Sequence, residues 1–202
     1  MMTITYEGRN ALYVNMTNRC PCACIFCLRT HKDHVFCADS LWLEREPTVK
    51  EVCDSIDAHD LSQYEEVVFC GYGEPTERLE DLLRVAAHIR GRSDVSIRIN
   101  TNGLADLING GKTANKLAGL IDTVSISLNA TNSEDYLKLV RPRFGAVSFD
   151  AMLAFAKDCT EYVETVVMTM VDVVTSKEEQ EIGRRLCESV GATFRIRPYE
   201  SD

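Results

Sequence analysis

Short runs of β-branched and apolar residues alternate along the chain with segments in which apolar residues recur every three to four positions. The first pattern is typical of buried strands and the second of helices that bury one face. Their alternation indicates βα units and a parallel sheet. The predicted strands lie near Tyr13–Thr17, Glu66–Cys70, Val95–Asn100, Thr123–Leu128, Thr165–Asp172 and Thr193–Arg197.

Several of the intervening segments begin with recognisable helix-capping signals. Thr48 and Glu51, like Ser176 and Glu179, have the spacing of a capping box, in which a hydroxyl and a carboxylate satisfy free backbone N–H groups. Thr76 precedes a periodic segment whose acidic residues suit a helix N-terminus. Further helices are predicted near Lys112–Leu120, Ser133–Val140, Asp150–Thr160 and Glu179–Val190.

The number of βα units defines the expected architecture. Six units fall short of the eight that close a TIM barrel. We therefore expect one α/β domain over residues 1–202, a partial (β/α)6 TIM-type barrel with parallel strands that is laterally open. Periodicity alone leaves a doubly wound sheet as an alternative. In either layout the active site gathers at the carboxyl ends of the strands.

Small or polar residues follow five of the predicted strands, which packing alone does not explain. These strand ends are Cys70–Thr76, Asn100–Gly103, Ser127–Asn129, Asp172 and Arg197. The first strand runs instead into a cysteine loop. Its irregular continuation, Leu28–Pro47, is long for a βα connection and indicates a functional loop.

Cys20, Cys24 and Cys27 stand in a CxxxCxxC spacing in this loop. Three thiolates from one loop can hold a [4Fe–4S] cluster and leave one iron without a protein ligand. An open coordination position allows a metal centre to act as a reagent. Cys22 lies within the same run and leaves a Cys-x-Cys zinc site open as an alternative. A second zinc-like set of donors consists of Cys27, His31, His34 and Cys37.

Composition narrows the class of protein. The 202 residues are 45% hydrophobic and 26% charged, as in an ordinary globular protein. The net charge of −9 argues against nucleic-acid binding, although Arg141, Arg143, Arg195 and Arg197 could form a local positive patch. No apolar run approaches the roughly 20 residues that span a bilayer. The N-terminal residues also lack the pattern of a signal peptide, so we expect a cytoplasmic protein.

Nine cysteines without an export signal favour metal or redox chemistry over a disulfide framework. Cys53, Cys159 and Cys187 lie in helical patterns and are expected to be buried small hydrophobic residues.

The cysteine loop and the strand ends together resemble the radical S-adenosylmethionine (SAM) superfamily, and the similarity covers nearly the whole chain. Phe26 is the aromatic residue of the family's cysteine motif. Gly71–Thr76 is similar to the family's Gly-Gly-Glu-Pro-Thr strand end, except that Tyr72 replaces a glycine, and Asn100–Gly103 is similar to its Thr-Asn-Gly turn. A narrower resemblance is to the TatD-linked radical SAM group, whose substrate is not established. It rests on the segments Thr17–Pro21, Gly73–Leu79, Asp106–Gly110 and Val140–Gly145.

The resemblance implies a function and two cofactors. Cys20, Cys24 and Cys27 would ligate three irons of a [4Fe–4S] cluster within the loop 18–37, and SAM would chelate the fourth. One electron from the cluster would cleave SAM and generate a 5′-deoxyadenosyl radical, which would abstract hydrogen from an unidentified substrate. The electron would come from an external one-electron reductant such as flavodoxin or ferredoxin. No second cluster motif is found, so no auxiliary cluster domain is expected.

The resemblance also implies roles for cofactor-binding residues. Gly73 would allow close approach of the methionyl end, and Glu74 would accept from its ammonium group. Phe26 would pack near the adenine, as would Ile196, and Asn129 would bond the ribose or methionyl group. Arg141 or Arg143 would bind the carboxylate. The full expected set is Phe26, Gly71, Tyr72, Gly73, Glu74, Asn102, Asn129, Arg141, Arg143 and Ile196.

Two points stay open from the sequence. A small open barrel would leave room for a bulky substrate, but no residue is identified as acting on it. The alternative function is a zinc- or iron–sulfur-binding protein-interaction module without SAM chemistry. That alternative leaves the strand end Gly73–Thr76 unexplained.

Overall fold

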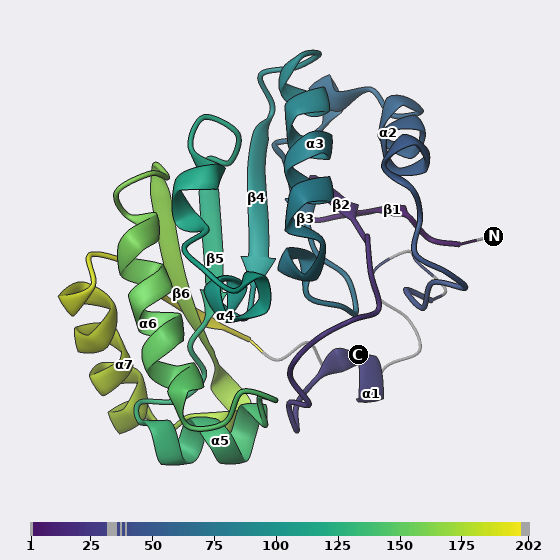
Figure 1. Cartoon of the computed structure of the whole chain (residues 1–202). Helices are drawn as coiled ribbons and strands as arrows, with labels where there is room; N and C mark the ends of the chain where they lie inside the picture. The colour runs from purple at the N-terminus through teal and green to yellow at the C-terminus, as the bar shows by residue number, and fades with distance from the viewer. Residues whose placement is uncertain (1, 32–35, 37, 39, 199–202) are drawn as a thin grey trace.

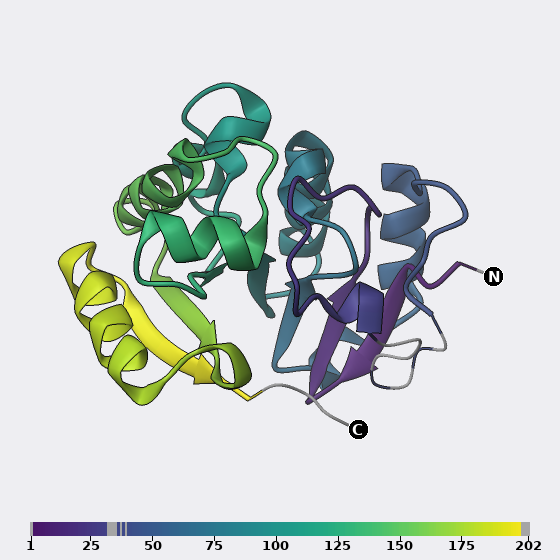
Figure 2. The ribbon, with the colours of Figure 1, turned by 90° about the horizontal axis from the view of Figure 1, so that it is seen from below.

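The structure, a computed structural model, describes residues 2–31, 36, 38 and 40–198 and contains one seven-stranded sheet. The strands lie in sequence order; β1 and β2 pair antiparallel and all later neighbours pair parallel. β1 and β7 are the two edges, so the sheet is an open partial barrel, as predicted (Figure 2). The strands are β1 Thr5–Gly8, β2 Ala11–Val14, β3 Glu66–Phe69, β4 Ser96–Thr101, β5 Thr123–Ser127, β6 Thr165–Val171 and β7 Thr193–Arg197.

Helices follow the parallel strands and cover the outer face of the sheet, while α1 and α5 lie at the carboxyl ends of the strands (Figure 1). The α-helices are α1 Leu28–His31, α2 Val49–Asp57, α3 Leu79–Arg90, α4 Ala105–Asn109, α5 Ser133–Val140, α6 Val147–Cys159 and α7 Lys177–Ser189. Short 3-10 helices are η1 Leu61–Gln63, η2 Pro75–Arg78, η3 Ala114–Leu117 and η4 Asp172–Val174. In the described part of the chain, no helix is long and apolar enough to cross a membrane.

All six predicted parallel strands are present, although the first spans Ala11–Val14 where Tyr13–Thr17 was predicted, and the sequence did not reveal β1. Its hairpin with β2 pairs Gly8 with Ala11 through the two residues between them. These residues, Arg9 and Asn10, have φ angles of 47° and 60°. Positive φ at both central positions is the geometry of the tight turns that suit twisted hairpins, and asparagine tolerates it well. The hairpin adds one antiparallel edge strand to the predicted sheet.

Both predicted capping boxes are confirmed, at the starts of α2 and α7. The helix predicted over Lys112–Leu120 is wrong, because that segment contains only the single 3-10 turn η3. The helical residues lie earlier, in α4, which ends at Gly110 with φ of 71°. A left-handed residue ends a helix because it turns the chain away from the helix axis.

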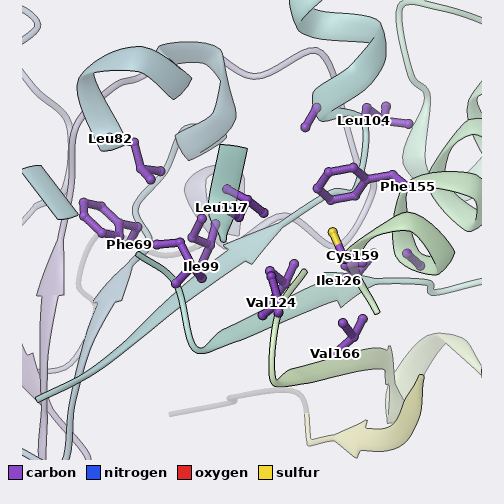
Figure 3. Packing of buried hydrophobic residues seen from close by; sticks show 14 of the residues in the cluster. Phe69, Leu82, Ile99, Leu104, Leu117, Val124, Ile126, Phe155, Cys159 and Val166 are labelled. Atoms are coloured by element: carbon purple, nitrogen blue, oxygen red, sulfur yellow. The ribbon is translucent and has the colours of Figure 1, made fainter. Parts of the chain in front are cut away.

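The two faces of the sheet differ in chemistry. The outer face presents alternate apolar residues to the helices and forms the main core (Figure 3). The predicted burial of Cys159 and Cys187 in this layer is confirmed, whereas Cys53 is only partly buried. The inner face carries a smaller apolar cluster around Tyr6 and Tyr13, whose rings stack 5.0 Å apart. The rest of that face is polar and positions the site.

Candidate cluster and cofactor site

The cysteine loop crosses the carboxyl end of the sheet and is fastened to the last turn of α5. The amide of Ala23 donates to the carbonyl of Val140 at 3.1 Å, and that of Ile25 to the carbonyl of Leu139 at 3.0 Å. The last carbonyls of a helix have no partner within the helix, so they are available to accept these bonds. The loop conformation therefore depends on α5 as well as on β2.

Burial separates Cys22 from the other three cysteines of the run. Cys22 is 4% exposed and belongs to the main core, whereas Cys20, Cys24 and Cys27 are partly exposed. Hydrogen bonds from the Cys22 thiol lower the pKa of Cys20 and of Cys24, and they raise the pKa of Cys22 itself. Burial raises the pKa of Cys27. The three cysteines in CxxxCxxC spacing are thus the accessible ones.

The chemistry of the accessible donors fits a [4Fe–4S] cluster. Three thiolates from one loop can each bind a separate iron of such a cluster and leave the fourth iron without a protein ligand. A structural zinc site instead takes four protein donors. In the alternative zinc set, His34 and Cys37 lie outside the described residues, as does the side chain of His31.

A buried hydroxyl beneath the loop supports the same interpretation. Tyr136 of α5 is fully buried, and within the described part of the chain its hydroxyl has no hydrogen-bond partner. Its electrostatic neighbours are Cys22, Cys24, Glu74 and Cys20, and burial raises its pKa. A buried donor without an acceptor is costly, so a group that brings acceptor sulfurs to this position fits the site. Tyr136 has no local sequence signal that would have selected it.

The Glu74 carboxylate joins the ends of β3 and β4. Its side chain accepts from the amide of Thr76 at 3.1 Å and from the hydroxyl of Thr76 at 2.7 Å. It also accepts from the hydroxyl of Thr101 and from the amide of Asn102, both at 2.7 Å. Glu74 is 3% exposed; burial raises its pKa, and these hydrogen bonds oppose the shift. The residue expected to receive the ammonium group of SAM is thus engaged within the protein.

Gly73 is required by the backbone of the cysteine loop. A Cβ at this position would lie 2.1 Å from the carbonyl oxygen of Thr17 and 2.7 Å from that of Arg19. The next amide, that of Glu74, donates to the same Arg19 carbonyl at 2.8 Å. The missing side chain therefore permits contact between the strand end and the loop, in addition to the expected approach of a ligand.

Gly71 and Tyr72 face the inner side of the sheet. A Cβ on Gly71 would lie 2.1 Å from the side-chain oxygen of the buried Asn15. Tyr72 is 6% exposed, belongs to the inner apolar cluster and meets Trp42 edge-on, with ring centres 5.2 Å apart. This packing accounts for a bulky residue where the resemblance predicts glycine.

The expected asparagines lie at two neighbouring strand ends. The side-chain amide of Asn102 donates to the sulfur of Cys20 at 4.0 Å, so the β4 end lies directly beside the first cysteine. Asn129 is 2% exposed, with φ of 55°, and its side-chain oxygen accepts from the amide of Val171 at 3.2 Å. Asn129 thereby ties the end of β5 to the end of β6.

The two arginines expected at the methionyl carboxylate follow the end of α5 and lie beside the cysteine loop, to which their backbones are hydrogen-bonded. Arg141 caps α5 in the left-handed conformation. The Arg143 guanidinium lies 4.8 Å from the ring centre of Phe144 and 3.5 Å from the Glu77 carboxylate. The structure does not bring either arginine into a contact with the cysteines.

A cavity of about 340 Å³ occupies the inner face of the sheet and opens beside the cysteine loop. Phe26 and Ile196, both expected near the adenine, line it. Three arginines, Arg98, Arg195 and Arg197, line it as well. Sequence analysis missed Arg98; its alternation with Asn100 in one strand is the signal that places both on the same face.

The comparisons with known proteins agree with this fold. The family model of the radical SAM superfamily matches residues 14–186, and the chain therefore belongs to that superfamily. Membership defines an enzyme whose cofactors are a [4Fe–4S] cluster and SAM. No curated protein matches the chain.

Solved structures show the same fold at low sequence identity. A radical SAM methyltransferase from Sphaerobacter thermophilus is 18% identical with a TM-score of 0.66, over 96% of this chain and 57% of that one. Streptococcus suis SuiB bound to S-adenosylmethionine is 18% identical with a TM-score of 0.69, over 94% and 40%. The FeFe-hydrogenase maturase HydG from Carboxydothermus hydrogenoformans is 15% identical with a TM-score of 0.68, over 95% and 44%. The chain thus spans about half the length of these proteins or less.

Proposed function

We propose that this chain cleaves SAM reductively and directs the resulting 5′-deoxyadenosyl radical to a hydrogen atom of a substrate. The observation that carries the proposal is the accessible triad Cys20, Cys24 and Cys27, held beside the cavity while Cys22 is buried. The bound cluster would supply the electron that breaks the carbon–sulfur bond of SAM.

The residues around the triad have distinct roles in this proposal. Asn102 orients Cys20 through the bond from its amide to the sulfur. Glu74 positions Asn102 and acts through it, because its carboxylate is already occupied by protein donors. Phe26 offers an apolar wall of the cavity to the adenine, whereas Ile196 lines the cavity but also packs against the main core. Asn129 keeps the β5 and β6 ends together at the cavity rim.

The finer identity is also part of the proposal. The segments Thr17–Pro21 and Val140–Gly145 support membership of the TatD-linked group within the superfamily. They are adjacent in the structure: the amide of Arg143 donates to the carbonyl of Pro21 at 2.8 Å. We also propose a cytoplasmic location, where flavodoxin or ferredoxin would supply electrons and the cysteine thiols would stay reduced.

The test is anaerobic reconstitution followed by assay of 5′-deoxyadenosine with dithionite and SAM. We expect one [4Fe–4S] cluster per chain, an electron paramagnetic resonance signal altered by SAM, and formation of 5′-deoxyadenosine. Cys24→Ala should lose all three, and Cys22→Ala, the matched control, should retain them. Stoichiometric zinc without a response to SAM would instead support the protein-interaction module. Loss of the cluster in Cys22→Ala alone, with the fold intact, would show that the ligand triad is different.

A further inference from the structure

The inner face of the sheet carries positive charge that the proposed cofactor chemistry does not use. Arg98, Arg195 and Arg197, which we term the inner arginine cluster, all line the cavity of about 340 Å³. Arg98 comes from the central strand β4 and the other two come from the edge strand β7, which is three strands away. The curvature of the sheet brings them to one cavity.

Strand geometry places the β7 arginines on the same side. Arg195 and Arg197 are two positions apart, so their side chains point to the same face of the sheet. Arg195 pairs in register with Thr169 of β6 and Arg197 with Val171, and both partners also line the cavity. Two consecutive inward positions of one strand are therefore occupied by guanidinium groups.

The negative charge in the cavity does not balance this cluster. Glu66 accepts two hydrogen bonds from Arg98, at 2.9 and 2.6 Å, and so neutralises that arginine. In the described part of the chain, Arg195 and Arg197 form no ion pair. Partial loss of hydration, together with the charges of Arg98 and Arg197, lowers the pKa of Arg195, although the residue keeps contact with solvent. Neighbouring guanidinium groups repel one another. Their clustering in a chain whose net charge is −9 therefore calls for an explanation in the local structure.

The neutral side chains of the cavity suit an anionic ligand, as the arginines do. Ser125 and Ser127 lie on the inner face of β5 and line the cavity, so they add hydroxyl donors to the guanidinium donors. Guanidinium groups bind carboxylate and phosphate through paired, charge-assisted hydrogen bonds, and hydroxyls complete such sites. The cavity therefore has the donor set of an oxyanion site.

The inner arginine cluster and the cysteine loop have different charged neighbours. The charged side chains that act on the Cys20 thiol are Glu74 and Arg29. Those that act on Arg195 are Arg98, Arg197, Glu66 and Arg9. Arg98 stands three positions before the β4 end at Thr101, or roughly 10 Å along the strand at about 3.3 Å per residue. Arg98 and Arg195 therefore lie before the carboxyl ends of their strands, whereas Arg197 is the last residue of β7.

We propose that the inner arginine cluster binds a carboxylate or phosphate group of the substrate and so holds the reacting part of that molecule near the cysteine loop. Calling the ligand a substrate rests on the proposed function, but the binding of an oxyanion does not. The two sources of the oxyanion share one recognition chemistry and are separated by the probes of the experiment.

The experiment measures modification of individual arginines by phenylglyoxal in the reconstituted protein, read by peptide mass spectrometry. The probes are inorganic phosphate and acetate, each compared with chloride at the same ionic strength. We expect one of them to slow modification of Arg195 and Arg197 by about tenfold at about ten times its dissociation constant, because the free fraction falls as 1/(1 + [L]/Kd). The more protective probe identifies the class of oxyanion. Arg185, whose side chain is 74% exposed on α7, is the internal control.

Two variants make the expectation specific. Arg195→Gln should remove the protection of Arg197 by either probe. Glu66→Gln should strengthen protection about threefold or more, because it removes the carboxylate that neutralises Arg98. Circular dichroism and iron content confirm that each variant is folded and carries the cluster.

Three results would overturn the inference. One is equal protection of Arg185 and the cluster, and another is no protection by either probe. The third is full protection by SAM alone with no further effect of phosphate or acetate, since the arginines would then bind the methionyl carboxylate. Formation of 5′-deoxyadenosine is measured on the same samples. If no 5′-deoxyadenosine forms, the proposed function is wrong. The proposal of anion binding is judged separately, on the protection data alone.

Discussion

The backbone amide of Asn102 donates a 2.7 Å hydrogen bond to the carboxylate of Glu74, and the side-chain amide of the same asparagine reaches the sulfur of Cys20. One residue at the β4 end thus connects the buried acid of the β3 end with the first cysteine of the loop. A substitution of Glu74 should therefore alter the surroundings of Cys20, although no hydrogen bond joins these two residues directly.

Glu74→Gln tests this connection. The amide that replaces one oxygen has two N–H groups, and these face donors from Thr76, Thr101 and Asn102. Unsatisfied buried donors cost about 1–3 kcal/mol each, so we expect a loss of roughly 2–4 kcal/mol in the free energy of unfolding. Urea unfolding of the apoprotein measures it. The control Glu80→Gln alters a side chain that is 72% exposed and should change stability by less than about 0.5 kcal/mol. Equal effects of the two variants would contradict the role of Glu74.

Three glycine-to-alanine variants should differ in a defined order. Gly73→Ala places a methyl group 2.1 Å from a backbone oxygen, so the loop or the strand end must move. Gly71→Ala meets the side chain of Asn15, which can partly give way, and Gly111→Ala meets nothing within 4 Å. We expect losses in urea unfolding of more than about 3 kcal/mol, about 1–3 kcal/mol and near zero, respectively. The idea fails if Gly73→Ala is as stable as Gly111→Ala.

Tyr136→Phe should leave the apoprotein as stable as the parent or stabilise it by about 1 kcal/mol, because it removes a buried hydroxyl that lacks a partner in the described part of the chain. The matched control is Tyr64→Phe. The Tyr64 hydroxyl donates to Glu7 at 2.7 Å, and the variant should lose about 1 kcal/mol. Thermal and urea unfolding of both variants provide the comparison. A loss in Tyr136→Phe equal to that of the control would show that its hydroxyl has an acceptor.

The capping box of α2 should depend on pH. Donors from Arg45 and Thr48 lower the pKa of Glu51 from 4.5 to about 2. A carboxyl whose pKa is lowered by folding stabilises the protein fully above its ordinary pKa, and this contribution is lost as the pH falls toward 2. Glu51→Gln should therefore be less stable than the parent at neutral pH, with the difference shrinking below about pH 4.5. Urea midpoints across this range measure it, and a constant difference would exclude the ionised cap as its cause.

The parallel sheet could be predicted because each strand is a short β-branched run with its own local signal. β1 was missed because its hairpin depends on the left-handed conformations of Arg9 and Asn10, which are weakly encoded by residue type. The helix predicted over Lys112–Leu120 failed because α4 ends at Gly110 and leaves only a short turn to follow.

The site could be predicted where it is contiguous in sequence. The cysteine spacing and the Gly73–Thr76 strand end are local patterns, and they led to the superfamily before the fold was known. The hydrogen bonds from Thr101 and Asn102 to Glu74 join residues far apart in the chain, so sequence could not show that this acid is internally occupied. The inner position of Arg98 likewise depends on strand register, which only the assembled sheet defines.

The attachment of the cysteine loop to α5 has a consequence for how the holoprotein forms. The amides of Ala23 and Ile25 terminate the helix by occupying its last carbonyls, so the end of α5 and the loop become ordered together. Iron bound by Cys24, which lies between these two amides, would slow hydrogen exchange at both of them. Loss of iron would fray the helix from the Val140 end. We therefore expect hydrogen exchange at the Val140 end of α5 to report whether iron is bound.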